Sequence, residues 1–186
     1  MKTQWEISVP QEEVERIAVT YGDPADALIA TKNYALYPLP EAITNWHAMV
    51  PLLTSDHWYD VTAFYSRRKA DLSPENAKLL YDYNQKAYDA AKKKDGLILY
   101  YQGVLLTNVA SENDSNLVLP FVPNCLSFCI WKTLPHAKEG AKVPAHKKAT
   151  KMTSLWFDGF SIIKYQVMLT NQSNSKFLVF KQVPKT

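Results

Sequence analysis

The clearest helical pattern of apolar and polar positions lies between Ser73 and Gly96. Ser73 is a good N-cap residue, and Pro74 suits the first position of a helix. The apolar stripe of this segment comprises Ala77, Leu80, Tyr81, Tyr88 and Ala91. Lysines at 92–94 favour the C-terminal end of a helix, and Gly96 can end it in the left-handed conformation. The pattern therefore predicts a helix that begins at Pro74.

Two more helices are predicted before this one. Pro40 can occupy the first turn of a helix that runs to Leu53, with its apolar residues roughly on one side. Ser55 is a plausible N-cap for a second helix over Asp56 to about Lys69, because Asp56 would lie at the positive end of the helix dipole. Upstream of both, short strands are predicted at Val14–Thr20 and Ala27–Thr31.

After Gly96 the period changes to that of strands. The predicted strands are Leu97–Leu106, Leu126–Lys132, Phe160–Leu169 and Lys176–Val183. Thr133 can cap a helix that follows the second of them. Pro144 should kink or restart that helix, which then runs to about Phe157.

Taken in order, these elements give strand, helix, strand, strand, helix, strand and one additional strand. This is the order of the ferredoxin-like fold. We therefore expect an α+β protein with an antiparallel sheet and extra N-terminal helices. A length of 186 residues suits a single domain over residues 1–186. Its helical insertion would cover about residues 40–95, and residues 97–183 would complete the ferredoxin-like core.

The composition of the chain excludes some classes of function. The chain is 47% hydrophobic, which is enough for a sizeable core. Its net charge of +3 is too small for a strongly electrostatic nucleic-acid binder, and the basic triplets 67–69 and 92–94 look like solvated helix ends. No apolar stretch is long enough to span a membrane, and the first residues do not resemble a signal peptide. We expect a cytoplasmic protein with both cysteines reduced.

The segment Phe128–Thr133, followed by Ala137, Ala141, Pro144 and His146, resembles the dimeric α/β-barrel superfamily. Antibiotic-biosynthesis monooxygenases belong to this superfamily, and the resemblance covers roughly residues 97–183. It implies a homodimer in which two sheets face each other, with a pocket between each sheet and its own helices.

A second resemblance spans most of the chain. The segments that carry it are Trp46–Leu53, Arg67–Asn76, Leu79–Ala90 and Leu126–Thr133, together with Pro144 and His146. They are similar to an uncharacterised family of fungal proteins. This resemblance implies no particular activity.

His146 and His136 are the candidate catalytic residues. An imidazole titrates near neutrality, so His146 could act as a general base, or as an iron ligand if haem is bound; His136 is the second candidate. The alternative is that both are ordinary histidines, one exposed and one partly buried. Their spacing is not that of a helical zinc pair, and we predict no metal site.

Aromatic residues could line a pocket for a flat, apolar ligand. The candidates are Trp131, Tyr165, Trp156 and Tyr101; the alternative is that they simply build the core. Cys125 and Cys129 are too far apart on a strand for a disulfide and should be structural. Glycine-rich phosphate loops are absent from the sequence, so we expect no nucleotide cofactor.

Two functions remain open at this point. The first is a small-molecule enzyme of the dimeric α/β-barrel type that acts on an aromatic or polyketide-like compound. The alternative is a non-catalytic protein of the same fold that binds a small ligand or a partner. In both cases we expect a small apolar or aromatic ligand and a homodimer, and neither a membrane nor a nucleic acid as partner.

Overall fold

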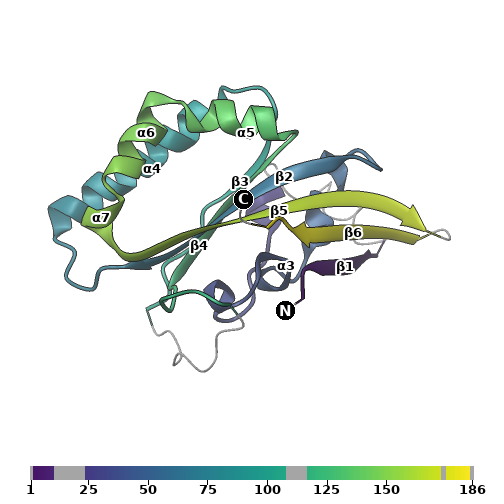
Figure 1. Cartoon of the computed structure of the whole chain (residues 1–186), viewed down its shortest axis with the longest axis horizontal. Helices are drawn as coiled ribbons and strands as arrows, with labels where there is room; N and C mark the ends of the chain where they lie inside the picture. Colours follow the sequence, from purple (N-terminus) through teal and green to yellow (C-terminus); the bar gives the residue numbers. More distant parts are fainter. Residues whose placement is uncertain (1, 11–23, 108–116, 173–174, 185–186) are drawn as a thin grey trace.

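The computed structural model describes residues 2–10, 24–107, 117–172 and 175–184. Six antiparallel strands form one sheet in the order β1-β6-β5-β2-β4-β3 (Figure 1). The strands are β1 (Gln4–Val9), β2 (Trp58–Arg68), β3 (Leu97–Tyr101), β4 (Cys125–Trp131), β5 (Phe157–Gln172) and β6 (Ser175–Gln182). The helices are α2 (Pro24–Ala27), α3 (Leu39–Ala42), α4 (Pro74–Lys92), α5 (Leu134–Ala141), α6 (Pro144–Lys151) and α7 (Thr153–Trp156), with 3-10 helices η1 (Tyr34–Leu36) and η2 (Trp46–Leu52).

Four of these strands and the helices between them form the ferredoxin-like unit. Along the chain they follow the order β2, α4, β3, β4, α5–α7 and β5, and in the sheet they lie as β5-β2-β4-β3. β6 and β1 extend the sheet beyond β5. The predicted α+β, ferredoxin-like fold is confirmed.

Each face of the sheet is covered by a different layer. Helices α4 to α7 arch over one face, and α3 with its neighbouring segments lies against the other (Figure 1). Because side chains alternate along a strand, β2 contributes to both sides. Val61, Ala63 and Tyr65 are in the core on the α3 side, whereas Thr62 and Phe64 face the helices α4–α7.

Trp46 is the centre of the layer on the α3 side. Its ring centroid lies 5.5 Å from that of Phe128 on β4 and 4.8 Å from that of Phe180 on β6. Its indole N–H donates a hydrogen bond to the carbonyl of Pro40 at 2.9 Å. The chain thus covers with its own residues the sheet face through which the resemblance implied that two copies pair. A homodimer stays a prediction, and it would have to use another surface.

Several predicted helix boundaries are confirmed. Ser73 caps α4 by accepting a hydrogen bond from the backbone N–H of Asn76. Gly96 has the expected left-handed φ of 83°, but α4 already ends at Lys92, so this glycine leads into β3 and does not close the helix. Thr133 is the N-cap position of α5. Pro144 begins α6 in its first turn, so the predicted helix is restarted there rather than continuous.

The predicted helix over Asp56–Lys69 is wrong, because Trp58–Arg68 form β2, the central strand of the ferredoxin-like unit. Asp56 lies in the left-handed region at φ 60°, where it forms a turn into the strand instead of a helix N-terminus. β2 is buried on both faces, so it lacks the strict alternation of a half-exposed strand. The expected helical insertion over 40–95 therefore contains the first core strand.

The predicted helix from Pro40 to Leu53 is also broken. Ile43 is extended, and it separates the short α3 from the 3-10 helix η2, which contains Pro51. Within Ala27–Thr31, Ala30 forms only an isolated bridge to Ile43. The strand predicted at Val14–Thr20 lies outside the described residues.

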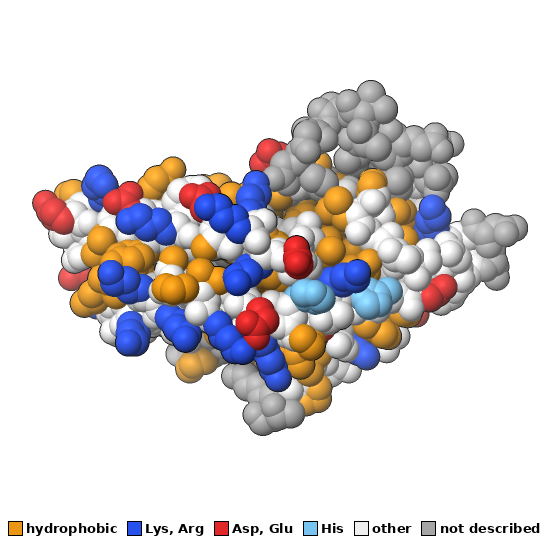
Figure 2. All heavy atoms as spheres, turned by 90° about the horizontal axis from the view of Figure 1, so that it is seen from above, with side chains coloured by type: hydrophobic (Ala, Val, Ile, Leu, Met, Phe, Trp, Pro, Cys, Tyr) orange, Lys and Arg blue, Asp and Glu red, His pale blue; other side chains and the backbone are white. Residues whose placement is uncertain are grey.

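The basic triplets differ from one another in the structure. Lysines 92–94 are exposed at the end of α4, as expected. Figure 2 shows Lys and Arg side chains spread over the helix face, with acidic and apolar ones between them. Arg67–Lys69 instead lie at the end of a strand and are half-buried, so the expected solvated helix end is wrong there. No described helix has the length and apolar character needed to cross a membrane.

Replacing Trp46 with alanine tests the covered sheet face. Trp46 is 1% exposed, and emptying so large a site should lower the free energy of unfolding by about 3–5 kcal/mol. Urea denaturation followed by far-UV circular dichroism measures this change. The control is Tyr81→Ala on α4, which removes a side chain that is 63% exposed and should cost no more than about 0.5 kcal/mol. Equal losses in the two variants would contradict the buried position of Trp46.

Candidate functional site

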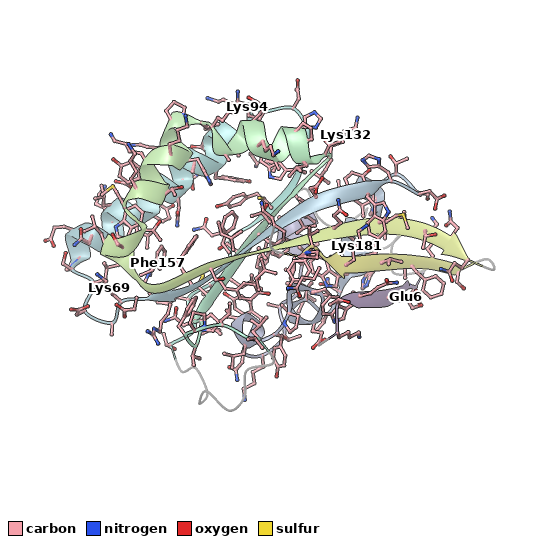
Figure 3. All side chains as sticks on the ribbon, in the orientation of Figure 1. Glu6, Lys69, Lys94, Lys132, Phe157 and Lys181 are labelled. Carbon is pink, nitrogen blue, oxygen red and sulfur yellow. The ribbon has the colours of Figure 1, made fainter. Side chains whose placement is uncertain are left out.

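A cavity of about 330 Å³ lies between the sheet and the helices α4 to α7. This volume is at the lower end of the range for small-molecule sites. Side chains from the helix layer and from the sheet project toward each other across this space, and Phe157 lies at the end near α7 (Figure 3).

Small side chains on the helices explain why the layers do not fill this space. The helix residues that line the cavity include Ala87, Ala91, Ala137, Gly140, Ala141 and Ala149. At Gly140 the helix comes so close to the Trp131 indole that a Cβ there would lie 2.4 Å from a ring atom. The helices can therefore approach the sheet only at their small residues, and a hollow is left between these points.

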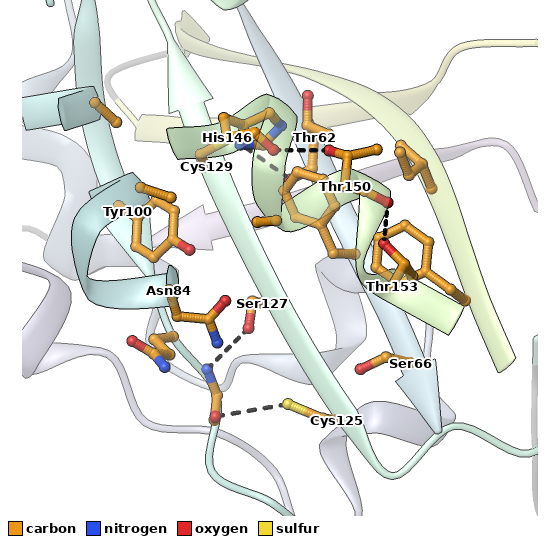
Figure 4. A pocket seen from close by; sticks show the side chains of 18 of the residues that line it. Thr62, Ser66, Asn84, Tyr100, Cys125, Ser127, Cys129, His146, Thr150 and Thr153 are labelled. Atoms are coloured by element: carbon orange, nitrogen blue, oxygen red, sulfur yellow. Dashed lines mark hydrogen bonds between the residues drawn. The ribbon is translucent and has the colours of Figure 1, made fainter. Parts of the chain in front are cut away.

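A polar cluster occupies one end of the cavity, where β2, β4 and β5 run side by side. Thr62 pairs with Cys129 on one side and with Lys164 on the other. The Lys164 ammonium donates a hydrogen bond to the Thr62 hydroxyl at 2.6 Å. His146 lines the same cavity from α6 (Figure 4), and its electrostatic interaction with Lys164 places it near this group. The cluster brings together an imidazole, an amine, a hydroxyl and a thiol.

Burial sets the protonation of this cluster. It lowers the pKa of His146, and the nearby charge of Lys164 lowers it further. Burial also lowers the pKa of Lys164, although Cys129 and Asp60 oppose this change. The pKa of the Cys129 thiol is raised by burial, and the thiol accepts a hydrogen bond from the Trp131 indole N–H at 3.1 Å. The imidazole is therefore held neutral, as a proton acceptor, and Cys129 is held as a thiol.

Polar groups also line the other end of the cavity. Arg68 and Ser66 reach it from β2, and Asn84 reaches it from α4 (Figure 4 labels Asn84 and Ser66). Cys125 donates a weak hydrogen bond to the carbonyl of Gly103, with the sulfur 3.6 Å from the oxygen. Ser66 hydrogen-bonds to the Cys125 sulfur, and Arg68 and Asn84 are further polar groups at this end.

Aromatic and aliphatic side chains form the walls between the two ends. Tyr100 lines the cavity, and burial raises the pKa of its hydroxyl, so it is a donor at neutral pH. The indole N–H of Trp156 is buried and has no hydrogen-bond partner within the described part of the chain. Phe160 and Ile162 on β5 also line the cavity and are 39% and 41% exposed. The opening is therefore apolar.

The structure brings three of the sequence-predicted site residues together. His146, Trp131 and Trp156 all border the cavity. His136 does not border it, because its ring packs against Gly96 and shares a 2.7 Å hydrogen bond with the Thr133 hydroxyl.

The two predicted tyrosines lie on the opposite face of the sheet. The Tyr165 hydroxyl accepts a hydrogen bond from the Leu39 backbone N–H at 3.4 Å, and its ring contacts Trp5. Tyr101 stacks on Phe128 with 4.9 Å between ring centroids. Both belong to the core that Trp46 covers, and neither borders this cavity.

Sequence reasoning missed Lys164, Arg68 and Thr62. Lys164 could have been predicted from the sequence. It follows Phe160 and Ile162 at alternate positions of a predicted strand, so the three side chains share one face. Arg68 and Thr62 were hidden by the incorrect helix over Asp56–Lys69.

The cavity fits a compact organic ligand better than haem. His146 is the one histidine among the lining residues of the described chain, and the volume of about 330 Å³ suits a few fused rings rather than a porphyrin. Among the described residues, no group of three or more His, Cys, Asp and Glu side chains is arranged to hold a metal ion.

The fold and the cavity together define a ferredoxin-like α+β protein with a ligand-sized pocket between its helices and its sheet. The chain belongs to the PB2B2.08-like family, whose model matches residues 27–181. This confirms the resemblance to an uncharacterised family. A search of curated proteins finds no match.

Several solved structures are similar to this chain. A dimeric ferredoxin-like protein of unknown function from Thermobifida fusca is 11% identical, with a TM-score of 0.45 over 60% of this chain and 93% of its own. Hydroxynitrile lyase from Passiflora edulis is 9% identical, with a TM-score of 0.44 over 58% and 92%. A candidate antibiotic-biosynthesis monooxygenase from Bacteroides thetaiotaomicron is 14% identical, with a TM-score of 0.38 over 59% and 88%.

The variant Lys164→Met tests the electrostatics of the polar cluster. Removing the ammonium should raise the pKa of His146, which should still stay below its ordinary value because burial is the larger cause. Titration of the imidazole resonances by NMR measures the change. Lys181→Met is the control. It removes a cation of β6 that lies above the Trp58 ring of β2, and it should leave the pKa of His146 unchanged. An unchanged pKa of His146 in the Lys164→Met variant would show that the two side chains do not interact.

Proposed function

We propose that the protein is a small-molecule enzyme that acts on an aromatic or polyketide-like compound in this cavity, without a nucleotide cofactor. The observation that carries the proposal is that His146 and Lys164 line the same largely apolar cavity, in which burial and the Lys164 charge lower the pKa of the imidazole. His146 would be the catalytic base, and Lys164 would stabilise negative charge on the substrate.

The chemistry that this pair supports is removal of a proton next to a carbonyl group. An imidazole nitrogen of His146 takes the proton, and the electron pair of the broken C–H bond moves toward the carbonyl oxygen. The resulting enolate oxygen carries a negative charge, which the Lys164 ammonium can stabilise at low local polarity. The reverse transfer returns the proton, so the cycle needs no other reactant.

Trp131 and Trp156 would hold the flat part of the substrate. Trp131 is fixed by Gly140 and Cys129, and Trp156 lines the same cavity. Tyr165, Tyr101 and His136 are not part of this proposal, because they lie outside the cavity.

A non-catalytic ligand-binding protein is the second candidate. The observation that favours it is that, among the described residues, the ring nitrogens of His146 have no hydrogen-bond partner to orient them; its backbone carbonyl accepts from Thr150. A catalytic base is usually held in place by a third group. The same cavity could then simply bind the ligand. Location in the cytoplasm and assembly as a homodimer stay predictions under either function.

Proton exchange distinguishes the two candidates. We expect the protein to speed the exchange of the C1 hydrogens of 2-tetralone, a flat enolisable ketone, with deuterium in D₂O. His146→Gln should reduce this acceleration by about 10²–10⁴-fold, the usual contribution of a general base. Loss of the C1 proton signal in NMR measures the rate.

His136→Gln is the matched control, because it makes the same change outside the cavity and should keep the rate of the unmodified protein. Binding of 2-tetralone without accelerated exchange would favour the non-catalytic candidate. Equal exchange rates in His146→Gln and the unmodified protein would overturn the assignment of the base.

A further inference from the structure

We infer that the ligand of this cavity is an anion, namely a flat aromatic carboxylate whose charged group lies against Arg68. This inference rests on the proposed use of the cavity for ligand binding, and it adds the charge of the ligand and the residue that recognises it.

Among the described residues, the charged side chains that line the cavity are all of one sign. Arg68 and Lys164 both line it, whereas no described Asp or Glu does. The positive charge of Lys164 is partly compensated by the hydrogen bond of its ammonium group to Thr62 and by the nearby charge of Asp60. Arg68 forms no ion pair with any described residue. A half-buried cation without a counter-charge is unfavourable, and an anionic ligand would remove that cost.

The backbone of Arg68 is held by the pairing of its strand and by a hydrogen bond. Alternation along β2 places Arg68 on the same face as Phe64 and Ser66, which also line the cavity. The pairing with β5 shifts register at this point, with Asp158 of β5 as the unpaired residue. The Asn124 side-chain oxygen accepts a hydrogen bond from the Arg68 backbone N–H at 2.9 Å, which fixes the backbone at the end of the strand. A planar guanidinium can bind both oxygens of a carboxylate, so a fixed arginine is well suited to this group.

The surroundings of Arg68 suit the same anion. Ser66 lies two residues before it on the same face of β2 and is 6% exposed, and Asn84 and Gln102 line the same end of the cavity. The side-chain amides of Asn84 and Gln102 can donate further hydrogen bonds to carboxylate oxygens.

The two cations, Lys164 and Arg68, lie at opposite ends of the cavity. Thr62, which binds Lys164, and Arg68 are six residues apart on β2, or roughly 20 Å between Cα atoms. A compact ligand can therefore place its carboxylate at only one of the two ends. With the carboxylate at Arg68, the apolar body lies along Leu80 and Trp156, and the far end of the ligand points toward His146.

Two dyes that differ only in charge test this inference. 8-Anilinonaphthalene-1-sulfonate carries a sulfonate in place of a carboxylate, and N-phenyl-1-naphthylamine has the same rings without it. We expect the anionic dye to bind more tightly in fluorescence titrations. Arg68→Met should weaken its binding by about 10-fold or more, and should change the binding of the neutral dye by less than about 2-fold.

Arg67→Met is the matched control, because it removes the same charge from the neighbouring position, which does not line the cavity. It should leave the preference for the anionic dye intact. Equal loss in Arg67→Met and Arg68→Met, loss of the preference in Lys164→Met alone, or equal binding of both dyes by the unmodified protein would each overturn the inference.

Filling the cavity separates failure of the ligand site itself from failure of its preference for an anion. Ala87→Trp and Ala149→Trp each place a large ring in the cavity and should abolish binding of both dyes. If neither dye binds the unmodified protein, or if both filled variants bind them normally, the cavity is not a ligand site. If both dyes bind in the cavity with equal affinity, the ligand site stands and only its preference for an anion is wrong.

Discussion

The structure depends on the different covers of the two faces of the central strands. β2 and β4 send alternate side chains to opposite sides, so both faces must be covered. On one face, large side chains such as Trp46 and Phe128 are buried and pack against each other. On the other face, the helices present mainly small residues to the sheet, and a cavity remains. One side of the sheet therefore stabilises the fold, and the other is available for a ligand.

This division also explains the chemistry of the site. The solid face provides a rigid sheet, and that sheet holds Thr62, Cys129 and Lys164 in register on three adjacent strands. The helix layer removes water from His146, which keeps its imidazole neutral. A group that accepts protons and a group that stabilises negative charge thus meet in one place. Arg68 is separate from them because it lies six residues beyond Thr62 on the same face of β2, at the other end of the cavity.

Sequence patterns predicted those elements whose signals are local. The N-cap of α4 at Ser73, the restart at Pro144 and the buried strand at Leu126–Lys132 all depend on neighbouring residues. β2 could not be predicted in this way, because its burial on both faces comes from segments far away in the chain. The segment from Pro40 to Leu53 was also mispredicted, because Ile43 is extended and separates α3 from η2.

The site was predictable only in part. Trp131 and His146 lie at a strand end and on a helix that the sequence indicated, and both reach the cavity. Tyr165 and Tyr101 were expected beside them, but the parity of their strand positions directs them to the opposite face. Parity can be assigned only when the register of a strand is known, and that register is set by the neighbouring strands.

The most direct test of the account is where a bound aromatic molecule lies. Nuclear Overhauser effects between N-phenyl-1-naphthylamine and assigned methyl groups of the protein locate it. The account predicts contacts to the methyl groups of Ala87 and Ala149, which line the cavity on the helix side. Contacts to Leu39 and Val61 on the opposite face would contradict the account, as would contacts to neither set.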